Sequence, residues 1–375
     1  MATLSLPVVQ ADRIESADNG AHVDRSKPYK SCIWLEGGLA FNRRSLNACL
    51  IVHHDRGYPH LLDYNGGDVD LAGVLAAKER IIAANQADGF PACRGCPHLV
   101  TRRWRRRRKP IRLIGIAQFS RCNIECSYCY LQTDDPAKFA AGYDPYAVLP
   151  ALRGLIESGA LDPRLIVDWG GGEPTIYPEF DAALELLTRF GATTWVHTNG
   201  TRLPRPIRDG LSTKRIHVLC SVDAGTRETW RRIKNKDLLD TVWRNLEQFS
   251  RLGVRVVLKY IVTEENCGEA ELRAFIASSR AVGAQELLID VDYNHPNPSP
   301  DVMRGLQRLK RLGTESGLYT TFGSTGANFT PEVDVAGRLR NAGDKWTAAI
   351  RLRFAARLAW ARSRWCLAVR RLRLR

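Results

Sequence analysis

Between residues 111 and 312, short apolar runs rich in β-branched residues alternate with longer segments in which apolar residues recur every three or four positions. Short runs of this composition predict buried strands, and the longer periodic segments predict amphipathic helices. The alternation predicts an α/β fold in which a parallel sheet is covered by helices. The six predicted strands are residues 111–119, 165–169, 194–197, 216–222, 254–262 and 286–291.

The helical segments carry recognisable start and stop signals. Asp144 and Pro145 predict the beginning of one helix, and Gly159 predicts its end. A second helix is predicted from Asp237 to the residue before Gly253. Further helices are predicted at residues 180–190, 271–282 and 302–312. Six strand–helix units predict a partial (βα)6 barrel, similar to a TIM barrel but not closed.

The polar motifs of this segment fall where the predicted strands end, which is the reactive edge of a βα barrel. A cysteine-rich loop follows the first strand, Gly-Gly-Gly-Glu-Pro at residues 170–174 follows the second, and Ser221 and Asp223 end the fourth. We expect these motifs to share one mouth of the barrel. Weaker candidates for the same mouth are His197, Asn199, Lys259, Asp290 and Asp292.

The cysteine loop has the spacing Cys122-x-x-x-Cys126-x-x-Cys129. Three thiolates on one short loop can hold three irons of a 4Fe–4S cluster and leave the fourth iron without a protein ligand. The spacing alone also fits a zinc site whose fourth ligand is His98 or His197, or three structural thiols. The motif after the second strand is needed to choose among them.

The cysteine spacing, together with Gly-Gly-Glu-Pro at residues 171–174, resembles the radical S-adenosylmethionine (radical SAM) superfamily over about residues 111–300, roughly half of the chain. The resemblance implies that Cys122, Cys126 and Cys129 hold a 4Fe–4S cluster whose open iron binds SAM. It also implies that the reduced cluster cleaves SAM to a 5′-deoxyadenosyl radical, which abstracts hydrogen from a substrate. An electron donor such as flavodoxin or ferredoxin is implied as a partner.

The resemblance further implies roles for the residues after the second strand. Gly171 and Gly172 would let the backbone approach the methionine part of SAM because no Cβ stands in the way. Glu173 would accept a hydrogen bond from the ammonium group of SAM. A tight turn after a buried strand also explains the two glycines, but it does not explain the placement of Glu173.

Four other residues are expected at the cofactor. Ser221 and Asp223 alternate onto one side of the fourth strand and would meet the ribose hydroxyls, unless Asp223 caps a helix instead. Tyr128 matches the family's aromatic residue beside the adenine, and ordinary packing of its ring is the alternative. Lys259 would meet the carboxylate of SAM or of the substrate, or remain a solvated lysine.

A second group of cysteines, Cys32, Cys49, Cys93 and Cys96, precedes the barrel. The Cys93-x-x-Cys96 turn is typical of metal sites, so we expect a second 4Fe–4S cluster or zinc here, with four uncommitted thiols as the alternative. Radical SAM enzymes that act on peptides often carry auxiliary clusters after the barrel, so the early position of this group puts a peptide substrate in doubt. The remaining cysteines are expected to be structural thiols: Cys220, Cys267 and Cys366.

The segment at residues 221–226, with Lys234 and Lys259 downstream, resembles a radical SAM subgroup that often accompanies surface-polysaccharide pathways. This resemblance favours a sugar, a lipid-linked sugar or another small metabolite as the substrate. A peptide-modifying radical SAM enzyme with an auxiliary cluster is the alternative. An alternative of another functional class is a non-catalytic zinc-binding protein that binds nucleic acid or a membrane surface.

Residues 102–109 carry a net charge of +7 and residues 338–375 one of +11, which together exceed the +15 of the whole chain, so the rest of the chain is mildly acidic. The first segment is typical of a solvated linker rather than a nucleic-acid site. In the second, an apolar stripe from Ile350 to Leu372 edged by arginines predicts a basic helix on an anionic membrane surface. A helix packed on the barrel and a disordered tail are the alternatives.

The sequence shows no secretory signal and no membrane-spanning apolar run, and its ten cysteines occur largely in metal-type groupings. These features predict reduced thiols in a cytoplasmic protein that touches the membrane only through its tail. The predicted organisation is an N-terminal tail at 1–28, a cysteine-containing metal-binding module at 29–100, a basic linker at 101–110, the barrel at 111–322, and a linker with the C-terminal basic helix at 323–375.

Overall fold

The fold is seen in a computed structural model of the chain, which describes residues 23–50, 57–96, 98–104, 109–129, 131, 146–292 and 298–323. Contacts between residues divide the chain into two compact units. The first unit lies within Met1–Glu125, Cys129–Cys220 and Gln248–Arg255, and the second lies within Cys126–Tyr128, Ser221–Glu247 and Val256–Arg375.

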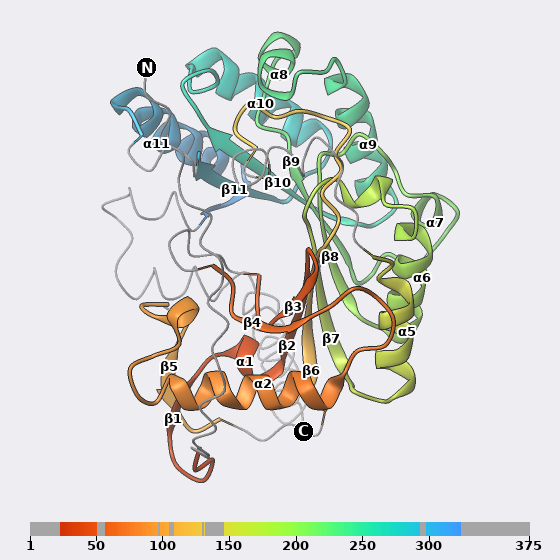
Figure 1. The fold of residues 1–375 in the computed structure, drawn as a ribbon. Helices are drawn as coiled ribbons and strands as arrows, with labels where there is room; N and C mark the ends of the chain where they lie inside the picture. The colour runs from red at the N-terminus through yellow and green to blue at the C-terminus, as the bar shows by residue number, and fades with distance from the viewer. Residues whose placement is uncertain are drawn as a thin grey trace, which may run out of the picture. The chain divides into compact units, whose positions relative to one another are not determined.

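A mostly parallel sheet forms the centre of the first unit (Figure 1). Its parallel strands follow the order β2 (Gly38–Asn42), β6 (Ile111–Ala117), β7 (Leu161–Trp169), β8 (Thr193–Thr198) and β9 (Ile216–Ser221). The antiparallel strands β3 (Ser45–Asn47) and β4 (His60–Asp63) extend the sheet beyond β2, and β1 (Tyr29–Ser31) pairs separately with β5 (Val100–Arg102). Because β6, β7 and β8 are parallel and in register near their ends, the loops after them leave from one edge.

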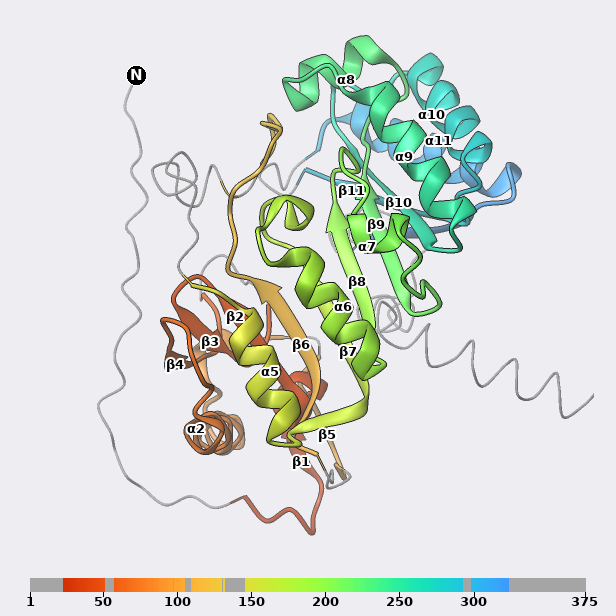
Figure 2. The same ribbon diagram turned by 90° about the vertical axis from the view of Figure 1, so that its right-hand side faces the viewer.

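Helices cover this sheet because each presents an apolar face to it. α5 (Leu149–Glu157) and α6 (Phe180–Phe190) lie on the same side of β6, β7 and β8 (Figure 2). The ring of Phe180 on α6 lies 4.8 Å from that of Trp169 on β7, and both side chains are fully buried. The other helical elements are α1 (Ile33–Gly37), α2 (Leu71–Ala84), α7 (Arg205–Arg208) and the 3-10 turns η1 (Pro91–Cys93) and η2 (Pro174–Ile176).

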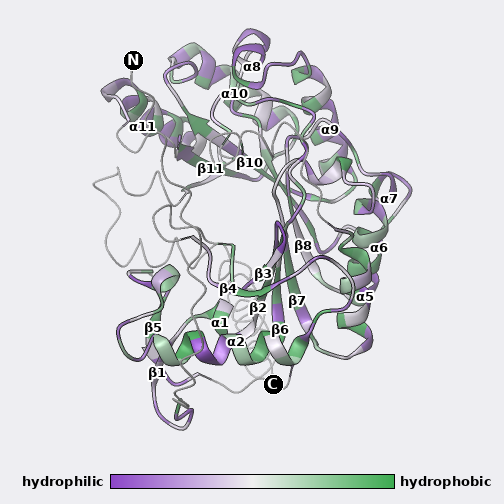
Figure 3. Cartoon of the chain, viewed as in Figure 1, coloured by the Kyte–Doolittle hydropathy of each residue, from purple (hydrophilic) through white to green (hydrophobic). Residues whose placement is uncertain are grey.

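The second unit contains the parallel strands β10 (Arg255–Val262), β11 (Glu286–Val291) and β12 (Tyr319–Phe322). Its helices are α8 (Arg227–Lys234), α9 (Leu239–Arg251), α10 (Glu269–Ala281) and α11 (Pro300–Glu315). α11 contacts α10, β11 and β12. Figure 3 shows hydrophobic and hydrophilic residues interspersed along α11, and its Leu306 and Leu309 are fully buried. The apolar residues that recur every three or four positions in this helix therefore form its packing face.

All six predicted strands are present, and the α/β fold with a mostly parallel sheet is confirmed. The predicted helices at residues 180–190, 271–282 and 302–312 correspond to α6, α10 and α11, and the helix predicted from Asp237 corresponds to α9. The strands β2 and β12 and the helix α8 were not predicted. Closure of the strands into a partial (βα)6 barrel stays a prediction.

Two element bounds differ from the predictions. The division of the chain into a cysteine-containing module, a linker and a barrel stays a prediction, and β2 of the predicted module pairs in parallel with β6 within one unit. The helix predicted from Asp144 begins at Leu149, and Asp144 and Pro145 lie outside the described residues. The basic linker begins inside β5, and Trp104 Nε1 donates to the Tyr29 carbonyl oxygen at 3.0 Å.

Two predicted basic segments lie wholly or partly outside the described residues: 105–108 in the linker, and the C-terminal helix within 338–375. Their predicted roles stay predictions. Within the described ranges, no helix is long and apolar enough to cross a membrane.

Candidate cofactor site

The segment after β7 is fastened by its backbone to the loop after β6. The Gly172 N–H donates to the Phe119 carbonyl oxygen at 2.8 Å, and the Glu173 N–H donates to that of Arg121 at 2.8 Å. A Cβ at Gly171 would lie 2.4 Å from the Phe119 oxygen, and one at Gly172 would lie 2.1 Å from the Arg121 oxygen. Both distances are shorter than a side chain tolerates, and Gly171 also has a φ of +94°. The glycines are therefore needed for contact with the cysteine loop, and an approach of SAM to them stays a prediction.

Glu173 is buried within this fastened segment, with 1% of its surface exposed. Its Oε1 accepts hydrogen bonds from the Thr175 N–H (3.1 Å), the Thr175 hydroxyl (2.5 Å) and the Thr198 hydroxyl (2.7 Å). Its Oε2 accepts one from the Asn199 N–H at 2.6 Å. Burial raises the pKa of Glu173, and the donors oppose that shift. Since Oε2 accepts one described hydrogen bond and Oε1 accepts three, Oε2 has more capacity for a further donor.

Asn199 links the glycine segment to the cysteine loop. Its Nδ2 donates to Cys122 Sγ at 3.6 Å and to Asn123 Oδ1 at 2.8 Å, while its backbone N–H donates to Glu173. Asn199, the residue directly after β8, thus contacts both a predicted SAM-binding carboxylate and a predicted cluster ligand. The sequence underrated Asn199 because Asn-Gly is also a common turn, and it gave no signal for Asn123 or Thr198.

His197 and Asp168 form a pair across neighbouring strands, with Nε2 of His197 2.6 Å from Oδ1 of Asp168. Each occupies the position before the last residue of its strand, β8 or β7. Both side chains are partly exposed. Sequence reasoning placed His197 at this edge but missed Asp168. The available signal was an acidic residue inside the otherwise apolar run 165–169.

In the second unit, Tyr128, Asp223 and Lys234 form a buried polar network. The Lys234 ammonium lies 2.5 Å from Asp223 Oδ2 and 2.6 Å from the Tyr128 hydroxyl, which also donates to Asp223. The side chains of Lys234 and Asp223 are 1% and 0% exposed. The Ile261 N–H donates to the other carboxylate oxygen of Asp223 at 2.6 Å. Both oxygens of Asp223 therefore have partners inside the protein.

The alternation expected to align Ser221 with Asp223 does not reach Asp223. β9 ends at Ser221, and Asp223 has a φ of +60°, in the left-handed region. This turn directs the carboxylate of Asp223 toward Lys234 and Ile261. The predicted contacts of Ser221 and Asp223 with ribose, and of Tyr128 with adenine, stay predictions.

Cys126 belongs to the same unit as this network. The Ser127 N–H, next along the loop, donates to the Ile233 carbonyl oxygen at 2.9 Å. Burial raises the pKa of the Cys126 thiol, and the neighbouring Lys234 ammonium opposes the shift. α8 therefore anchors the middle of the cysteine loop through its last residues.

The weaker candidates of the second unit lie on or just after β10 and β11. Lys259 is half-buried on β10, Asp290 is buried on β11, and Asp292 follows β11. Ile261 pairs with Asp290, and the twofold repeat of a strand puts Lys259 on the same face as Ile261. Lys259 and Asp290 therefore share one face of this part of the sheet.

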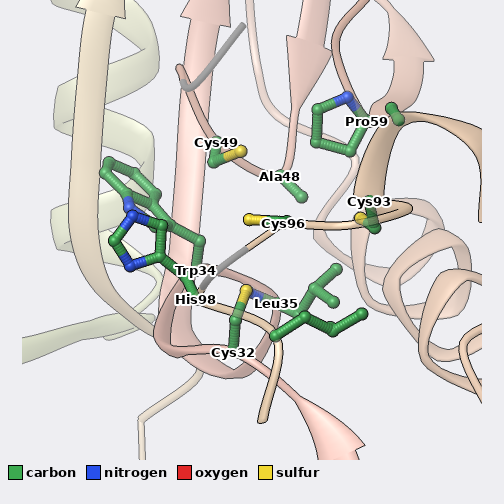
Figure 4. A pocket seen from close by; sticks show the side chains of 11 residues that line it. Cys32, Trp34, Leu35, Ala48, Cys49, Pro59, Cys93, Cys96 and His98 are labelled. Carbon is green, nitrogen blue, oxygen red and sulfur yellow. The ribbon is translucent and has the colours of Figure 1, made fainter. Parts of the chain in front are cut away.

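The second cysteine group is brought together in the first unit: Cys32, Cys49, Cys93 and Cys96 line one pocket (Figure 4). Burial raises the pKa of the Cys32 thiol to about 12 and that of Cys93 to about 11. In the part of the chain that the structure describes, no three Cys, His, Asp or Glu side chains stand at metal-binding geometry, and this holds for both cysteine groups. Binding of a metal would require the thiolates of either group to move closer together around the metal.

The chain is similar to known proteins over this region. The sequence profile of the radical SAM superfamily matches residues 117–273. Fe-coproporphyrin III synthase of Methanosarcina barkeri is 26% identical over 148 residues, which cover 39% of this chain and 36% of that protein. Mycofactocin maturase MftC of Mycobacterium tuberculosis is 24% identical over 161 residues, covering 42% of this chain and 39% of that protein. The aligned regions thus span less than half the length of these relatives.

Among solved structures, SuiB of Streptococcus suis bound to SAM aligns with a TM-score of 0.48 and 14% identity, covering 72% of this chain and 60% of that one. The cofactors of the radical SAM family are a 4Fe–4S cluster and SAM. The profile match begins in β6 and includes the cysteine loop, the Gly-Gly-Glu segment and the strands up to β10. Residues 117–273 therefore form a radical SAM domain.

Proposed function

We propose that this protein is a radical SAM enzyme in which Cys122, Cys126 and Cys129 bind a 4Fe–4S cluster and SAM occupies its open iron. The observation that carries this proposal is the cysteine loop fastened to the Gly-Gly-Glu segment by two backbone hydrogen bonds. Asn199 also contacts both Cys122, a predicted cluster ligand, and Glu173, the predicted SAM-binding carboxylate. These contacts hold the two side chains in a fixed position relative to each other.

The residues around the loop suit such a cluster. The loop offers thiolates, the ligands that iron–sulfur clusters take. Hydrogen-bond donors reach two of these sulfurs, from the Asn199 amide to Cys122 and from the Lys234 ammonium to Cys126. Such donors orient thiolate ligands and disperse their negative charge. When bound and reduced, the cluster supplies the electron that splits the C5′–S bond of SAM, and the 5′-deoxyadenosyl radical then takes a hydrogen atom from the substrate.

The chain's own residues position SAM in this proposal. Glu173 Oε2, which accepts one described hydrogen bond, accepts a second from the SAM ammonium group. Lys259 binds a carboxylate of SAM or of the substrate, and Ser221, Asp223 and Tyr128 lie around the nucleoside. The Asp223 carboxylate and the Tyr128 hydroxyl already bind the Lys234 ammonium, so in this role they would contact SAM and Lys234 at the same time.

The substrate we favour is a sugar, a lipid-linked sugar or another small metabolite, on the basis of the sequence at residues 221–226. A peptide substrate is the second candidate, favoured by the extra cysteine group. Deuterated candidates of each class separate the two, because deuterium from the true substrate should appear in 5′-deoxyadenosine.

We further propose a cytoplasmic enzyme that receives electrons from flavodoxin or ferredoxin, with its C-terminal basic segment on an anionic membrane.

The proposal is tested by reconstituting the protein anaerobically with iron and sulfide, reducing it with dithionite, and measuring 5′-deoxyadenosine after SAM is added. We expect cluster absorbance and SAM-dependent product. The absence of both the cluster and the product would refute the enzyme assignment. Zinc without labile sulfide would instead indicate a non-catalytic binding protein.

Replacing Glu173 by Gln should weaken SAM binding without loss of the cluster. A hydrogen bond to a charged group contributes about 1.5–3 kcal/mol, so we expect the Kd of SAM to rise roughly 10- to 100-fold. Equilibrium dialysis of the reconstituted variant measures the Kd, and iron content shows whether the loop is intact. Glu179→Gln is the matched control, because Glu179 lies near the same 3-10 turn and accepts hydrogen bonds from Tyr177 and Leu149. An unchanged Kd in Glu173→Gln would disprove the assigned role.

A further inference from the structure

The four cysteines of the second group come from separate segments of the first unit. Cys32 precedes α1 as its N-cap, Cys49 follows β3, Cys93 ends η1, and Cys96 lies in the turn after η1. In Figure 4 the sulfur atoms of Cys32, Cys49 and Cys96 are directed toward a common space, and Cys93 lies beside Cys96. The Cys32 thiol also lies close enough to Cys93 and Cys96 to interact electrostatically with both. Four thiols thus line one pocket although their positions extend over much of the N-terminal region.

Apart from His98, the rest of the pocket is apolar. Its other lining residues are Trp34, Leu35, Ala48, Pro59, Ala92, His98 and Leu99. No carboxylate and no Lys or Arg is among the described residues that line it. Hard cations such as Mg²⁺ and Ca²⁺ need oxygen ligands, whereas sulfur ligands select zinc and iron–sulfur clusters. The pocket therefore has the donor set of a thiolate metal centre.

Backbone N–H groups act as donors to two of these sulfurs, those of Cys32 and Cys96. The Leu35 N–H donates to Cys32 Sγ at 3.4 Å, and the Trp34 N–H also acts on this sulfur. The backbone N–H groups of His98 and Leu99 act in the same way on Cys96.

This arrangement distinguishes the group from isolated buried cysteines. A thiol sulfur is a weak acceptor, whereas a metal-bound thiolate is held and oriented by such donors. At Cys32 and Cys96 the donors come from the residues two and three positions further on.

We propose that Cys32, Cys49, Cys93 and Cys96 form a second metal centre, closed by four thiolates and independent of the Cys122–Cys126–Cys129 loop. A single zinc ion and a 4Fe–4S cluster share this ligand chemistry. Either form has a protein ligand at every position, so this centre does not bind SAM. It joins α1, the segment after β3 and the turn after η1, and α1 leads directly into β2, the strand that pairs with β6.

The centre is tested in the variant Cys122→Ala/Cys126→Ala/Cys129→Ala, which removes the loop ligands and so keeps the result separate from SAM chemistry. This variant is purified anaerobically and loaded with zinc or with iron and sulfide. We expect either about one zinc per chain, or about four irons with equal labile sulfide. Absence of stoichiometric metal in both preparations would overturn the proposal.

Further changes in that background identify the ligands. Adding Cys49→Ala and Cys96→Ala should abolish metal binding, whereas adding His98→Ala should preserve it, because the His98 backbone donor remains. Cys267→Ala is the control for loss of an unrelated thiol. Metal retained without Cys49 and Cys96, or lost with His98→Ala, would contradict a four-thiolate centre. X-ray absorption of the loaded triple variant gives a reading that does not depend on whether the further variants fold. Four sulfur ligands and no nitrogen per metal site are expected, and a nitrogen ligand would overturn the proposal.

Discussion

Protein with Cys126→Ala should form no 5′-deoxyadenosine above the protein-free control. The change leaves two thiolates on the loop, which is too few to hold a cluster with a single open iron. Loss of a group that only orients a metal ligand already costs about 10- to 100-fold, so loss of the ligand itself should exceed that range. The reconstituted variant is assayed anaerobically with dithionite and SAM.

The matched control for this variant is Cys267→Ala. Cys267 is a half-buried thiol before α10 whose Sγ contacts the Glu264 carbonyl oxygen at 3.6 Å. Its replacement should leave SAM cleavage within about twofold of the wild type, because Cys267 lies outside the loop. Cleavage by Cys126→Ala at the rate of this control would show that Cys126 is not a cluster ligand.

Lys234→Met should lower the free energy of unfolding by about 3–5 kcal/mol, because it removes one partner of a buried ion pair. Asp223 would keep the Ile261 N–H and the Tyr128 hydroxyl as donors but would lose its only described cation. Urea denaturation of the metal-free protein, followed by circular dichroism, measures the change. The variant should also retain less iron, since Lys234 and Ile233 anchor the segment that contains Cys126.

Two further variants separate the ion pair from a general effect of losing a lysine. Lys236→Met changes an exposed lysine just after α8 and should shift stability by less than about 0.5 kcal/mol. Adding Asp223→Asn to Lys234→Met should recover part of the loss, because the unpaired buried charge is removed. Equal stability of Lys234→Met and Lys236→Met would contradict the importance of the pair.

The strands of the radical SAM domain were predictable because parallel strands buried on both faces read as continuous apolar runs. Residues 165–169 and 286–291 show this clearly. β2 and β12 were missed because they are short. They are strands because they pair with β6 and β11, not because of their own composition. α8 was missed because most of its residues are charged or polar, and only Trp230 and Ile233 supply large buried apolar side chains.

The site was predictable at the level of motifs but not of contacts. The positions of Gly171 and Gly172 follow from the sequence, yet the carbonyl oxygens that exclude a Cβ there belong to a loop some fifty residues earlier. The buried pair of Lys234 and Asp223 had no signal, because lysine is rarely buried and a turn at Asp223 ends the strand alternation. Pairing of Asp168 with His197 depends on the register of β7 with β8, which periodicity alone does not fix.

The central claim is that the loop cluster has one iron open to SAM. Electron paramagnetic resonance of the anaerobically reduced wild-type protein, recorded with and without SAM, tests it most directly. We expect a cluster signal whose g-values and line shape change when SAM is added, because SAM becomes a ligand of the open iron. A spectrum that is identical with and without SAM, or no cluster signal in either sample, would contradict the claim.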